Sequence, residues 1–401
     1  MSHNFTRAVG AIASTLVLCH CASAQGSATS ALTQNTAPEI ITGTDGMKLA
    51  ATPLETFASA WAMTFVPDGR AIVTEKVGDI WLLSPQGKKL GKVSNSPTVD
   101  ARGQGGMGDF ILHPDFAENG TVFLSYVERD AGDDSLSGAA VERATLTLSE
   151  TGGALSNREV IWRQAPKVEG NGHYGHRLAV SPDGHLFISS GERQKFNPAQ
   201  NMAMNLGKII RINQDGSVPE DNPFYGNGAA ADQVWTLGHR NPLGIAFDSD
   251  GRLWEQEMGP KGGDELNLII RSKNYGYPFV SEGEHYDGTK IPSHASMPIF
   301  EAPSVAWVPA ISPAGLMFYD GDTFADWKGD AFIGGLSSKA LVRVSFAPAS
   351  GDGGAAPEAS EAARYEWDKR IREPEQGPDG AIYVLEDGEG GRLLRLTPAA
   401  N

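Results

Sequence analysis

A short pattern of polar and apolar positions recurs along the chain. In each copy, a turn built from Pro, Asp or Asn and Gly is joined to a short run of β-branched, aromatic and other apolar residues. Asp-Gly supplies the positive φ angles of a hairpin turn, and alternating apolar residues are typical of a half-buried strand. The copies lie at 66–73, 113–124, 181–188, 247–254 and 377–384, with a degenerate copy at 328–333.

These repeated units predict an all-β fold. No long helical periodicity interrupts them, and units of this size with strands between them fit a radial repeat. The natural architecture is a six-bladed β-propeller of four-stranded antiparallel blades. The alternative is a two-sheet β-sandwich, whose turns would be spaced more closely. A propeller builds one face of its central channel from loops, and there we expect a functional site.

The N-terminal part of the chain differs from the repeats. Residues 1–24 have the form of a secretory signal, with Arg7 ahead of a short apolar core and a small-residue cleavage site at the end. Residues 25–46 are aperiodic and rich in Ser, Thr, Ala and Asn, which predicts a flexible leader. Residues 47–401 are then expected to form a single six-bladed β-propeller domain.

The cysteines indicate the compartment. Both of them, Cys19 and Cys21, fall inside the predicted signal, so the mature chain would hold neither a free thiol nor a disulfide. The apolar run of the signal is too short to span a bilayer. We therefore expect an exported protein, periplasmic or secreted, that is not inserted in the membrane.

The net charge of the chain limits the kinds of partner that it can bind. The formal net charge of the 401-residue chain is −16, which argues against a nucleic-acid-binding surface or an anionic membrane surface. An acidic protein that binds an acidic ligand must concentrate its cations locally. The positions of individual Arg and Lys residues are therefore informative.

The stretch 238–265 carries the densest set of candidate groups. Arg240 and Asn241 precede a proline that stiffens the turn. A short strand leads to the glycine-rich run 259–263, which frees backbone carbonyls beside the acids at positions 264 and 265. Carbonyl and carboxylate oxygens are the ligands that Ca²⁺ prefers. The alternative is a glycine-rich surface turn with solvated acids.

Two further loops precede predicted strands. In 103–109, four glycines permit close backbone approach to a ligand, and Gln104 offers a side chain that can donate and accept hydrogen bonds. In 170–177, His173 could take a proton near neutral pH, and Arg177 nearby could hold an anion. The alternatives are a tight turn between blades and a structural histidine.

The C-terminal third adds cations and an aromatic face. Arg370 and Arg372 are two residues apart on one strand, so they would point to the same face and could bind carboxylates. Lys339 follows a glycine-led loop, and Trp307 could stack on a planar ligand. The alternatives are exposed charges and a core tryptophan.

Several common catalytic motifs do not occur in the sequence. There is no His-Glu-x-x-His pair, no Walker-type phosphate loop and no Gly-x-Ser-x-Gly elbow. Without cysteines in the mature chain, a thiolate zinc site is also excluded.

These motifs, in this order, carry a resemblance. From about Leu54 to Leu396 the chain resembles the soluble, calcium- and pyrroloquinoline-quinone (PQQ)-dependent sugar dehydrogenases, especially the periplasmic aldose sugar dehydrogenase branch. That family folds as a six-bladed propeller. The most specific matches are 103–106, 173–177, 207–212, 218–224, 240–244, 257–267, 274–278, and 370–372 before 376–380.

The resemblance implies roles for the residues of the cofactor site. His173 matches the general base that takes the proton of the sugar's anomeric hydroxyl as a hydride passes to the quinone. Gln104, Arg240 and Asn241 match cofactor contacts, with Arg240 near the developing negative charge. Cofactor carboxylates are held at the positions of Arg370 and Arg372.

The resemblance also implies two calcium sites. Gly259 and Pro260 match the pair whose backbone carbonyls hold the cofactor-bound Ca²⁺. Glu265 and Tyr275 match positions near a second, structural calcium.

Some positions depart from the family pattern. Ser337 stands where the family often has a lysine, and Lys339 is the candidate to take over its cofactor contact. Trp307 is the candidate for the stacking residue. His176 replaces a glycine common in the branch and places a second imidazole near His173, a change that could alter cofactor binding or substrate choice.

The function that this resemblance implies is the oxidation of aldose sugars at C1 to lactones, with PQQ and Ca²⁺ as cofactors. One alternative is a calcium-dependent hydrolase of the lactonase type, which would use metal-bound water. Another is a ligand-binding propeller without catalysis. The preferred sugar, the electron acceptor and the choice between monomer and homodimer are left open.

Overall fold

The structure is a computed structural model that describes Met1 and residues 37–347 and 357–399. The predicted signal 1–24, beyond its first residue, and the leader up to residue 36 lie outside the described residues. Everything below concerns the unit that begins at Ala37.

Four-stranded antiparallel runs repeat along this unit. In each run the Asp-Gly turn identified in the sequence, or its degenerate counterpart, connects the first strand to the second. The first two runs are β3 (Ala60–Phe65), β4 (Ala71–Glu75), β5 (Ile80–Leu83) and β6 (Lys89–Ser94), then β7 (Met107–Leu112), β8 (Thr121–Arg129), β9 (Leu136–Leu148) and β10 (Gly153–Arg163). A short parallel pairing of β10 with β6 joins these two runs into one sheet. The two-residue strand β11 (Val168–Glu169) pairs with β9 of this sheet.

Three separate four-stranded sheets follow in sequence order. They are β12 (Gly175–Val180), β13 (Leu186–Ser190), β14 (Lys208–Ile212) and β15 (Val234–Leu237); β16 (Pro242–Phe247), β17 (Leu253–Glu257), β18 (Asp264–Leu268) and β19 (Val305–Trp307); and β20 (Pro313–Phe318), β21 (Ala331–Gly335), β22 (Ala340–Ala347) and β23 (Glu358–Glu366).

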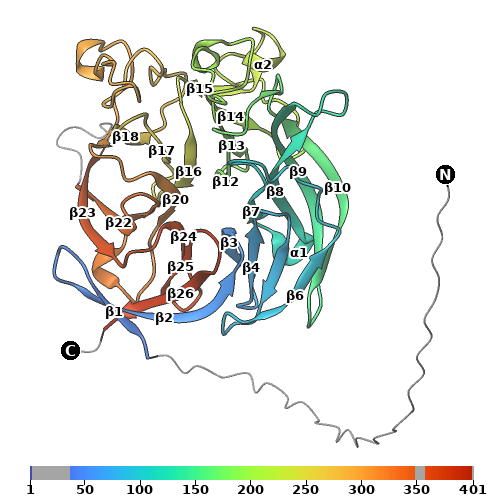
Figure 1. The fold of residues 1–401 in the computed structure, drawn as a ribbon, viewed down its shortest axis with the longest axis vertical. Helices are drawn as coiled ribbons and strands as arrows, with labels where there is room; N and C mark the ends of the chain where they lie inside the picture. Colours follow the sequence, from blue (N-terminus) through green and yellow to red (C-terminus); the bar gives the residue numbers. More distant parts are fainter. Residues whose placement is uncertain (2–36, 348–356, 400–401) are drawn as a thin grey trace, which may run out of the picture. The chain divides into compact units, whose positions relative to one another are not determined.

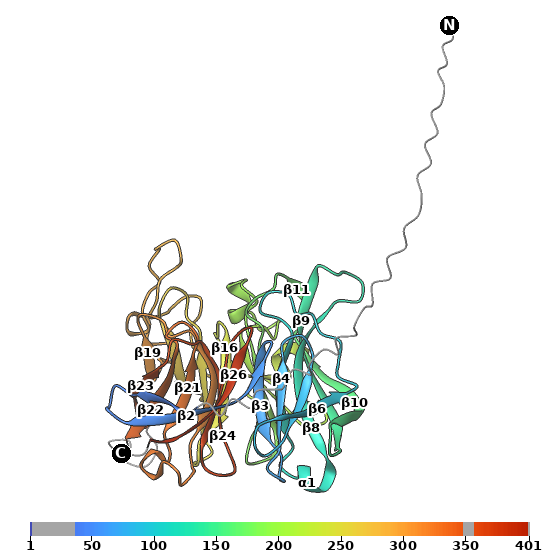
Figure 2. The ribbon, with the colours of Figure 1, turned by 60° about the horizontal axis from the view of Figure 1, so that its bottom comes forward.

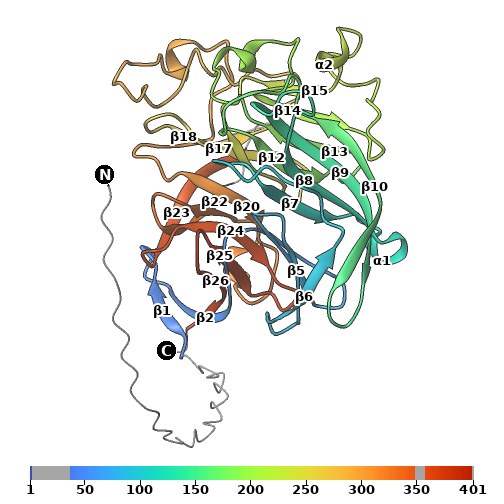
Figure 3. The same ribbon diagram turned by 45° about the vertical axis from the view of Figure 1, so that its right-hand side comes forward.

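The last sheet joins the two ends of the unit. It comprises β24 (Ile371–Gln376), β25 (Ile382–Glu386) and β26 (Gly391–Pro398), with β2 (Lys48–Phe57) antiparallel to β26 and β1 (Glu39–Thr42) outside β2. Figure 3 shows β1 and β2 beside β26. The prediction of a flexible leader over 25–46 is therefore wrong for residues 39–42. These residues form a strand, and its Ile41 is buried in the core.

The first strands of the runs lie against one another in a closed order: β3, β7, β12, β16, β20, β24 and again β3. Figure 1 looks along this arrangement, with these strands at its middle and β6, β10 and β23 toward the outside. Apolar side chains of neighbouring sheets pack between them, as where Phe332 and Leu341 meet Ile371 and Val384. The predicted all-β fold is confirmed.

Helices are short and lie in the connections. They are the α-helices α1 (Phe116–Asn119) and α2 (Ala229–Asp232) and the 3₁₀-helices η1 (Asn197–Gln200), η2 (His294–Ser296) and η3 (Ala325–Trp327). In Figure 2, α1 lies at one end of the sheets and β11 at the other. Within the described part of the chain, no helix has the length and apolar character needed to cross a membrane.

Candidate active site

A cavity of about 400 Å³ lies where the first strands begin and the second strands end. Almost every lining residue comes just before or at the start of a first strand, or just after a second strand. The segment before β3 and the ends of β4, β17, β21 and β25 contribute in this way. The lining residues are Ser59, Trp61, Lys76, Gly103, Gln104, Tyr174, Gly175, His176, Asn241, Leu243, Met258, Ser312, Leu336, Arg370, Arg372, Asp387 and Gly388.

The lining concentrates positive charge in an acidic protein. Lys76, Arg370 and Arg372 carry three positive charges against the single negative charge of Asp387, a net of +2. The Nε of Arg370 donates to Asp387 Oδ2 at 2.7 Å, and the Nε of Arg372 donates to Oδ1 at 2.8 Å. Burial raises the pKa of Asp387, but the two guanidinium groups outweigh it and hold that pKa below its ordinary value. Asp387 therefore stays ionised and fixes both arginines at the cavity wall.

Gln104 connects two of the predicted loops. Its backbone N–H donates to Asn171 O at 2.7 Å, and its side-chain Oε1 accepts from the backbone N–H of His173 at 2.8 Å. Lys76 Nζ, in turn, donates to Gly103 O at 2.5 Å. The glycine-rich loop 103–106 is thus fixed to the histidine loop on one side and to a lining cation on the other.

His173 lies beside the cavity rather than in its wall, next to the lining residues Tyr174 and Gly175. Its Nδ1 is 2.5 Å from Glu192 Oε1, and both side chains are buried. Glu192 Oε2 accepts from the backbone N–H of Phe196 at 2.6 Å and from that of Lys195. A carboxylate only accepts, so the proton of a neutral His173 lies on Nδ1 and the lone pair lies on Nε2.

The electrostatics of His173 keep it neutral. Burial lowers its pKa, Glu192 opposes that effect, and the positive charge of Arg240 lowers the pKa further. The backbone φ of His173 is +49°, a conformation that non-glycine residues seldom adopt. The arrangement can hold a bare ring nitrogen that is ready to accept a proton.

The turn that carries Arg240 and Asn241 is fixed by Glu257. The backbone N–H groups of both residues donate to Glu257 Oε2, and Arg240 Nη1 donates to Met258 O at 2.8 Å. Arg240 Nε and Asn241 Oδ1 are buried without a hydrogen-bond partner among the described residues. Buried polar atoms are normally paired, so these two are available to a ligand.

The predicted metal residues meet at a second, smaller cavity of about 10 Å³. Gly259, Pro260, Glu265 and Tyr275 all line it, together with Arg240. In the described part of the chain, the carbonyls of Gly259 and Pro260 accept no hydrogen bond. A void of this size holds about one water molecule or one ion.

Two neighbours bear on that small cavity. Gly259 N donates to Asp264 Oδ1 at 2.8 Å, and burial raises the pKa of Asp264 to about 6. Burial, and secondarily the charge of Glu257, raise the pKa of Glu265. The carbonyl of Tyr275 already accepts from His294 Nε2 at 3.0 Å, and only its second lone pair remains for a cation.

Two predicted cofactor residues lie elsewhere. Lys339 Nζ is paired with Asp368 at 2.5 Å and is half exposed. Trp307 is buried in the core between sheets, and its Nε1 donates to Glu361 Oε2 at 2.7 Å. Neither belongs to the described lining of the two cavities. Lys339 lies in an exposed ion pair and Trp307 in the core, so the structure brings neither of them to the described cavities.

His176 lines the large cavity. Its ring stacks on Trp61 with centroids 5.1 Å apart, and its Nδ1 is 2.9 Å from Ser125 Oγ. Its φ is +64°, which explains why glycine suits this position, and Gly108 leaves the space that the ring fills. Burial, aided by the charge of Arg177, lowers the pKa of His176 to about 3. The second imidazole is therefore a neutral part of the wall.

Sequence reasoning missed four residues of the site. Lys76 and Asp387 each come directly after the second strand of a run, Glu192 comes two residues after one, and Trp61 is the second residue of β3. The signal that could have found the first three is their position: a polar residue at the far end of the strand that follows an Asp-Gly turn.

Comparison with known proteins agrees with this geometry. The family model described as Glucose / Sorbosone dehydrogenase matches residues 57–395. The chain is similar to the aldose sugar dehydrogenase YliI of Escherichia coli strain K12, with 36% identity over 347 residues that cover 84% of this chain and 90% of that protein.

Solved structures give the same result. The apo form of the soluble aldose sugar dehydrogenase from Escherichia coli has a TM-score of 0.81 and 34% identity, covering 88% of this chain and all of that one (100%). The PQQ-bound aldose sugar dehydrogenase from Streptomyces coelicolor has a TM-score of 0.65 and 25% identity, covering 88% of this chain and 98% of that one.

Proposed function

This chain belongs to the glucose/sorbosone dehydrogenase family, and from that premise we propose that it oxidises aldose sugars at C1 to lactones with PQQ and Ca²⁺. The observation that carries the proposal is the cationic cavity beside a neutral, carboxylate-bound histidine. PQQ is a planar quinone with three carboxylates, and a lining with net charge +2 suits such an anion.

The residues present fit both groups. Arg370 and Arg372 would hold cofactor carboxylates, because guanidinium groups bind carboxylates through paired hydrogen bonds. Gln104 and Asn241 would contact the cofactor from the facing loops, and the unpaired Nε of Arg240 would donate to a negatively charged oxygen. The free carbonyls of Gly259 and Pro260 would supply oxygen ligands to Ca²⁺.

His173 would act as the general base. Its Nε2 takes the proton of the C1 hydroxyl, and Glu192 stabilises the imidazolium that forms because its carboxylate accepts the Nδ1 hydrogen. The C1–H bond breaks with its electron pair as the C1=O bond forms. The bound quinone would supply the acceptor for that hydride, with Ca²⁺ as the Lewis acid.

The alternatives use less of the site. A lactonase-type hydrolase would need a metal-bound water but gives the pair Arg370 and Arg372 no task. A binding propeller would need neither the neutral base nor its buried carboxylate partner. Lys339 and Trp307, which do not line either of the two cavities, are left out of the proposed cofactor contacts.

The wider assignment follows the same reasoning. The four-stranded runs would be the six blades of a propeller, and the predicted signal 1–24 would direct export to the periplasm or beyond. The substrate would be an aldose, and the electron acceptor and the choice between monomer and homodimer stay open.

The proposal is tested by cofactor binding. Chelator-treated protein is titrated with PQQ, with and without Ca²⁺, and binding is followed by the absorbance of the quinone and by thermal unfolding. Saturable binding that requires Ca²⁺ supports the proposal. If neither signal changes, the proposed function is wrong.

A further inference from the structure

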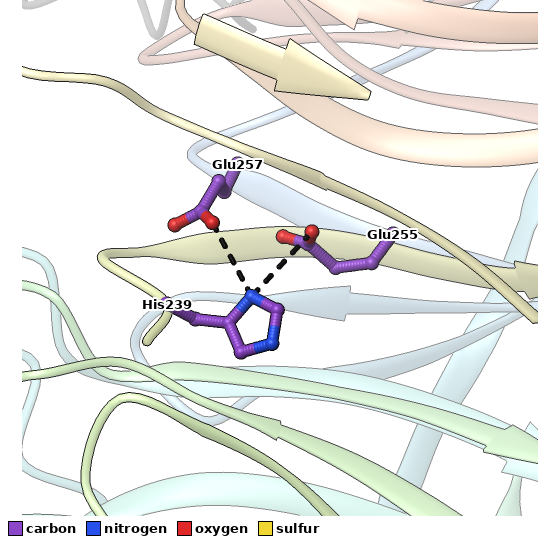
Figure 4. A group of neighbouring side chains, drawn as sticks. All are labelled: His239, Glu255 and Glu257. Carbon is purple, nitrogen blue, oxygen red and sulfur yellow. Dashed lines mark hydrogen bonds and ion pairs between the residues drawn. The ribbon is translucent and has the colours of Figure 1, made fainter. Parts of the chain in front are cut away.

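A buried cluster of a histidine and two glutamates lies behind the cofactor-contacting turn. His239 directly precedes Arg240, and Glu255 and Glu257 project from β17. His239 and Glu255 are completely buried (0% exposed), and Glu257 is nearly so. Figure 4 shows both carboxylates pointing toward the same ring nitrogen, Nδ1 of His239. The distances are 3.3 Å to Glu257 Oε1 and 3.8 Å to Glu255 Oε2.

Protein groups satisfy this cluster only in part. Glu255 Oε2 accepts from Asn267 Nδ2 at 3.1 Å, but Glu255 Oε1 and Asn267 Oδ1 are buried without a partner in the described part of the chain. Glu257 Oε2 accepts from the backbone of Arg240 and Asn241, and its Oε1 lies within hydrogen-bond distance of His239 Nδ1. An unpaired carboxylate oxygen in the interior is costly. A ligand that accepts electron pairs would remove that cost.

Negative charge gathers around the same point. The register places Glu257 opposite Glu265 and Glu255 opposite Asn267 on the paired strands β17 and β18. The guanidinium of Arg240 is directed to Met258 O instead of to these carboxylates. A divalent cation would balance the charge.

We propose that His239 Nδ1, Glu255 and Glu257 bind a divalent transition-metal ion of the Zn²⁺ type. Ligands about 2.1 Å from Zn²⁺ at tetrahedral angles are roughly 3.4 Å apart, close to the two separations measured from Nδ1. Thr236 Oγ1 lies 2.9 Å from His239 Nε2, and by accepting that N–H it leaves the Nδ1 lone pair for the metal. The imidazole ligand separates this site from the oxygen-only sites that suit Ca²⁺.

The site has a consequence for the neighbouring turn. His239 directly precedes Arg240, and Glu257 directly precedes Met258. A metal bound by both would therefore link these two segments. The proposal itself does not need the cofactor, since it stands on the distances and unpaired atoms of the cluster. It is therefore tested without PQQ or sugar.

The experiment compares the full chain with Glu255→Gln and, as a control at a buried carboxylate that lines neither cavity, Glu142→Gln. Each protein is stripped with a chelator, dialysed against Zn²⁺ alone and assayed for bound metal by elemental analysis. Wild type and Glu142→Gln are expected to retain one equivalent of Zn²⁺, and Glu255→Gln to bind it about 100-fold more weakly. Co²⁺ serves as a second probe, because its visible absorption reports the coordination of bound metal.

Thermal unfolding of the same samples completes the test. Zn²⁺ is expected to raise the Tm of wild type by several degrees and to leave that of Glu255→Gln unchanged. Without metal, Glu255→Gln should melt no lower than wild type, which also shows that it folds. The proposal is overturned if stripped wild type neither binds Zn²⁺ nor gains stability, or if Glu255→Gln binds Zn²⁺ as wild type does. Either result would show that the cluster is a hydrogen-bonded network that binds no metal.

Discussion

The Nδ1 of His173 and the Oε1 of Glu192 lie 2.5 Å apart in the interior, nineteen residues apart in sequence. Glu192 is itself held by two backbone N–H groups, so the imidazole is fixed in one tautomer. This pair gives the proposed base its direction and its proton affinity. The first two predictions test it.

Replacing Glu192 with glutamine should slow sugar oxidation. The amide cannot stabilise the imidazolium and can hold the wrong tautomer, so kcat should fall by about 10²–10⁴-fold with a smaller change in KM. Steady-state kinetics measure this. Glu142→Gln, at a buried carboxylate paired with Arg158 away from the cavity, is the control and should keep its kcat. Equal kcat values for wild type and Glu192→Gln would contradict the role of the pair.

The pH profile of kcat/KM should report the same pair. Burial lowers the pKa of His173, so the base stays deprotonated until the pH falls below about 6.5, the ordinary value. Glu192 raises that pKa, and its replacement by glutamine should move the acid limb to lower pH. An acid limb that stays in place or moves to higher pH in the variant would show that His173 is not the titrating group.

Arg372→Ala should weaken PQQ binding, and Lys339→Ala should not. Arg372 lines the cavity and shares Asp387 with Arg370, whereas Lys339 is paired with Asp368 outside it. Losing one charged contact to a carboxylate costs about 2–3 kcal/mol, or roughly 30–150-fold in Kd. Calorimetric titration with PQQ and Ca²⁺ gives both constants. A larger effect at Lys339 than at Arg372 would reverse this assignment.

Trp307→Phe should lower stability without changing cofactor affinity. The substitution removes the indole hydrogen bond to Glu361, which keeps its ion pair with Arg364, so the cost should be about 1 kcal/mol. Urea unfolding measures the cost and PQQ titration measures the affinity. A change in Kd with no change in stability would restore Trp307 as a cofactor contact.

The variant His176→Gly should be less stable than wild type at neutral pH, and this difference should disappear in acid because wild type then loses stability. Removing the buried ring lowers the free energy of unfolding by more than glycine at this positive φ raises it. The net loss of stability should be about 1–2 kcal/mol at pH 7. In wild type the pKa of His176 is lowered to about 3, so the unfolded chain binds a proton more readily below pH 6.5. At pH 5 that linkage removes about 2 kcal/mol from wild type alone.

Urea unfolding of both proteins at pH 7 and pH 5 measures this difference. Wild type should be the more stable at pH 7, and the gap should close or invert at pH 5. A gap that is constant with pH would show that His176 is not held neutral.

The repeats in the sequence predicted much of the fold because the turns are local. Asp68-Gly69 precedes β4 and Asp379-Gly380 precedes β25, as alternation predicted. Strand β1 escaped prediction because its pairing depends on β2, which is itself held by β26 at the other end of the chain. No local pattern in 39–42 encodes that closure.

The site residues, like the strands, were predictable where a local pattern sets them and not where the fold does. Arg370 and Arg372 were placed on one face by strand periodicity, and the structure brings both to the cavity. Glu192 was missed because its partner His173 becomes a neighbour only through the fold. Trp307 and Lys339 were assigned by position alone, and their contacts with Glu361 and Asp368 are tertiary features that spacing does not show.

The most direct test is a dye-linked oxidation assay on the purified mature chain with glucose or another aldose. Wild type and His173→Ala are compared with PQQ and Ca²⁺ added singly, together and not at all. The account predicts oxidation only when both are present, and its collapse in His173→Ala. Oxidation without PQQ, full activity of His173→Ala, or no oxidation of any aldose by protein shown to bind the cofactor would contradict it.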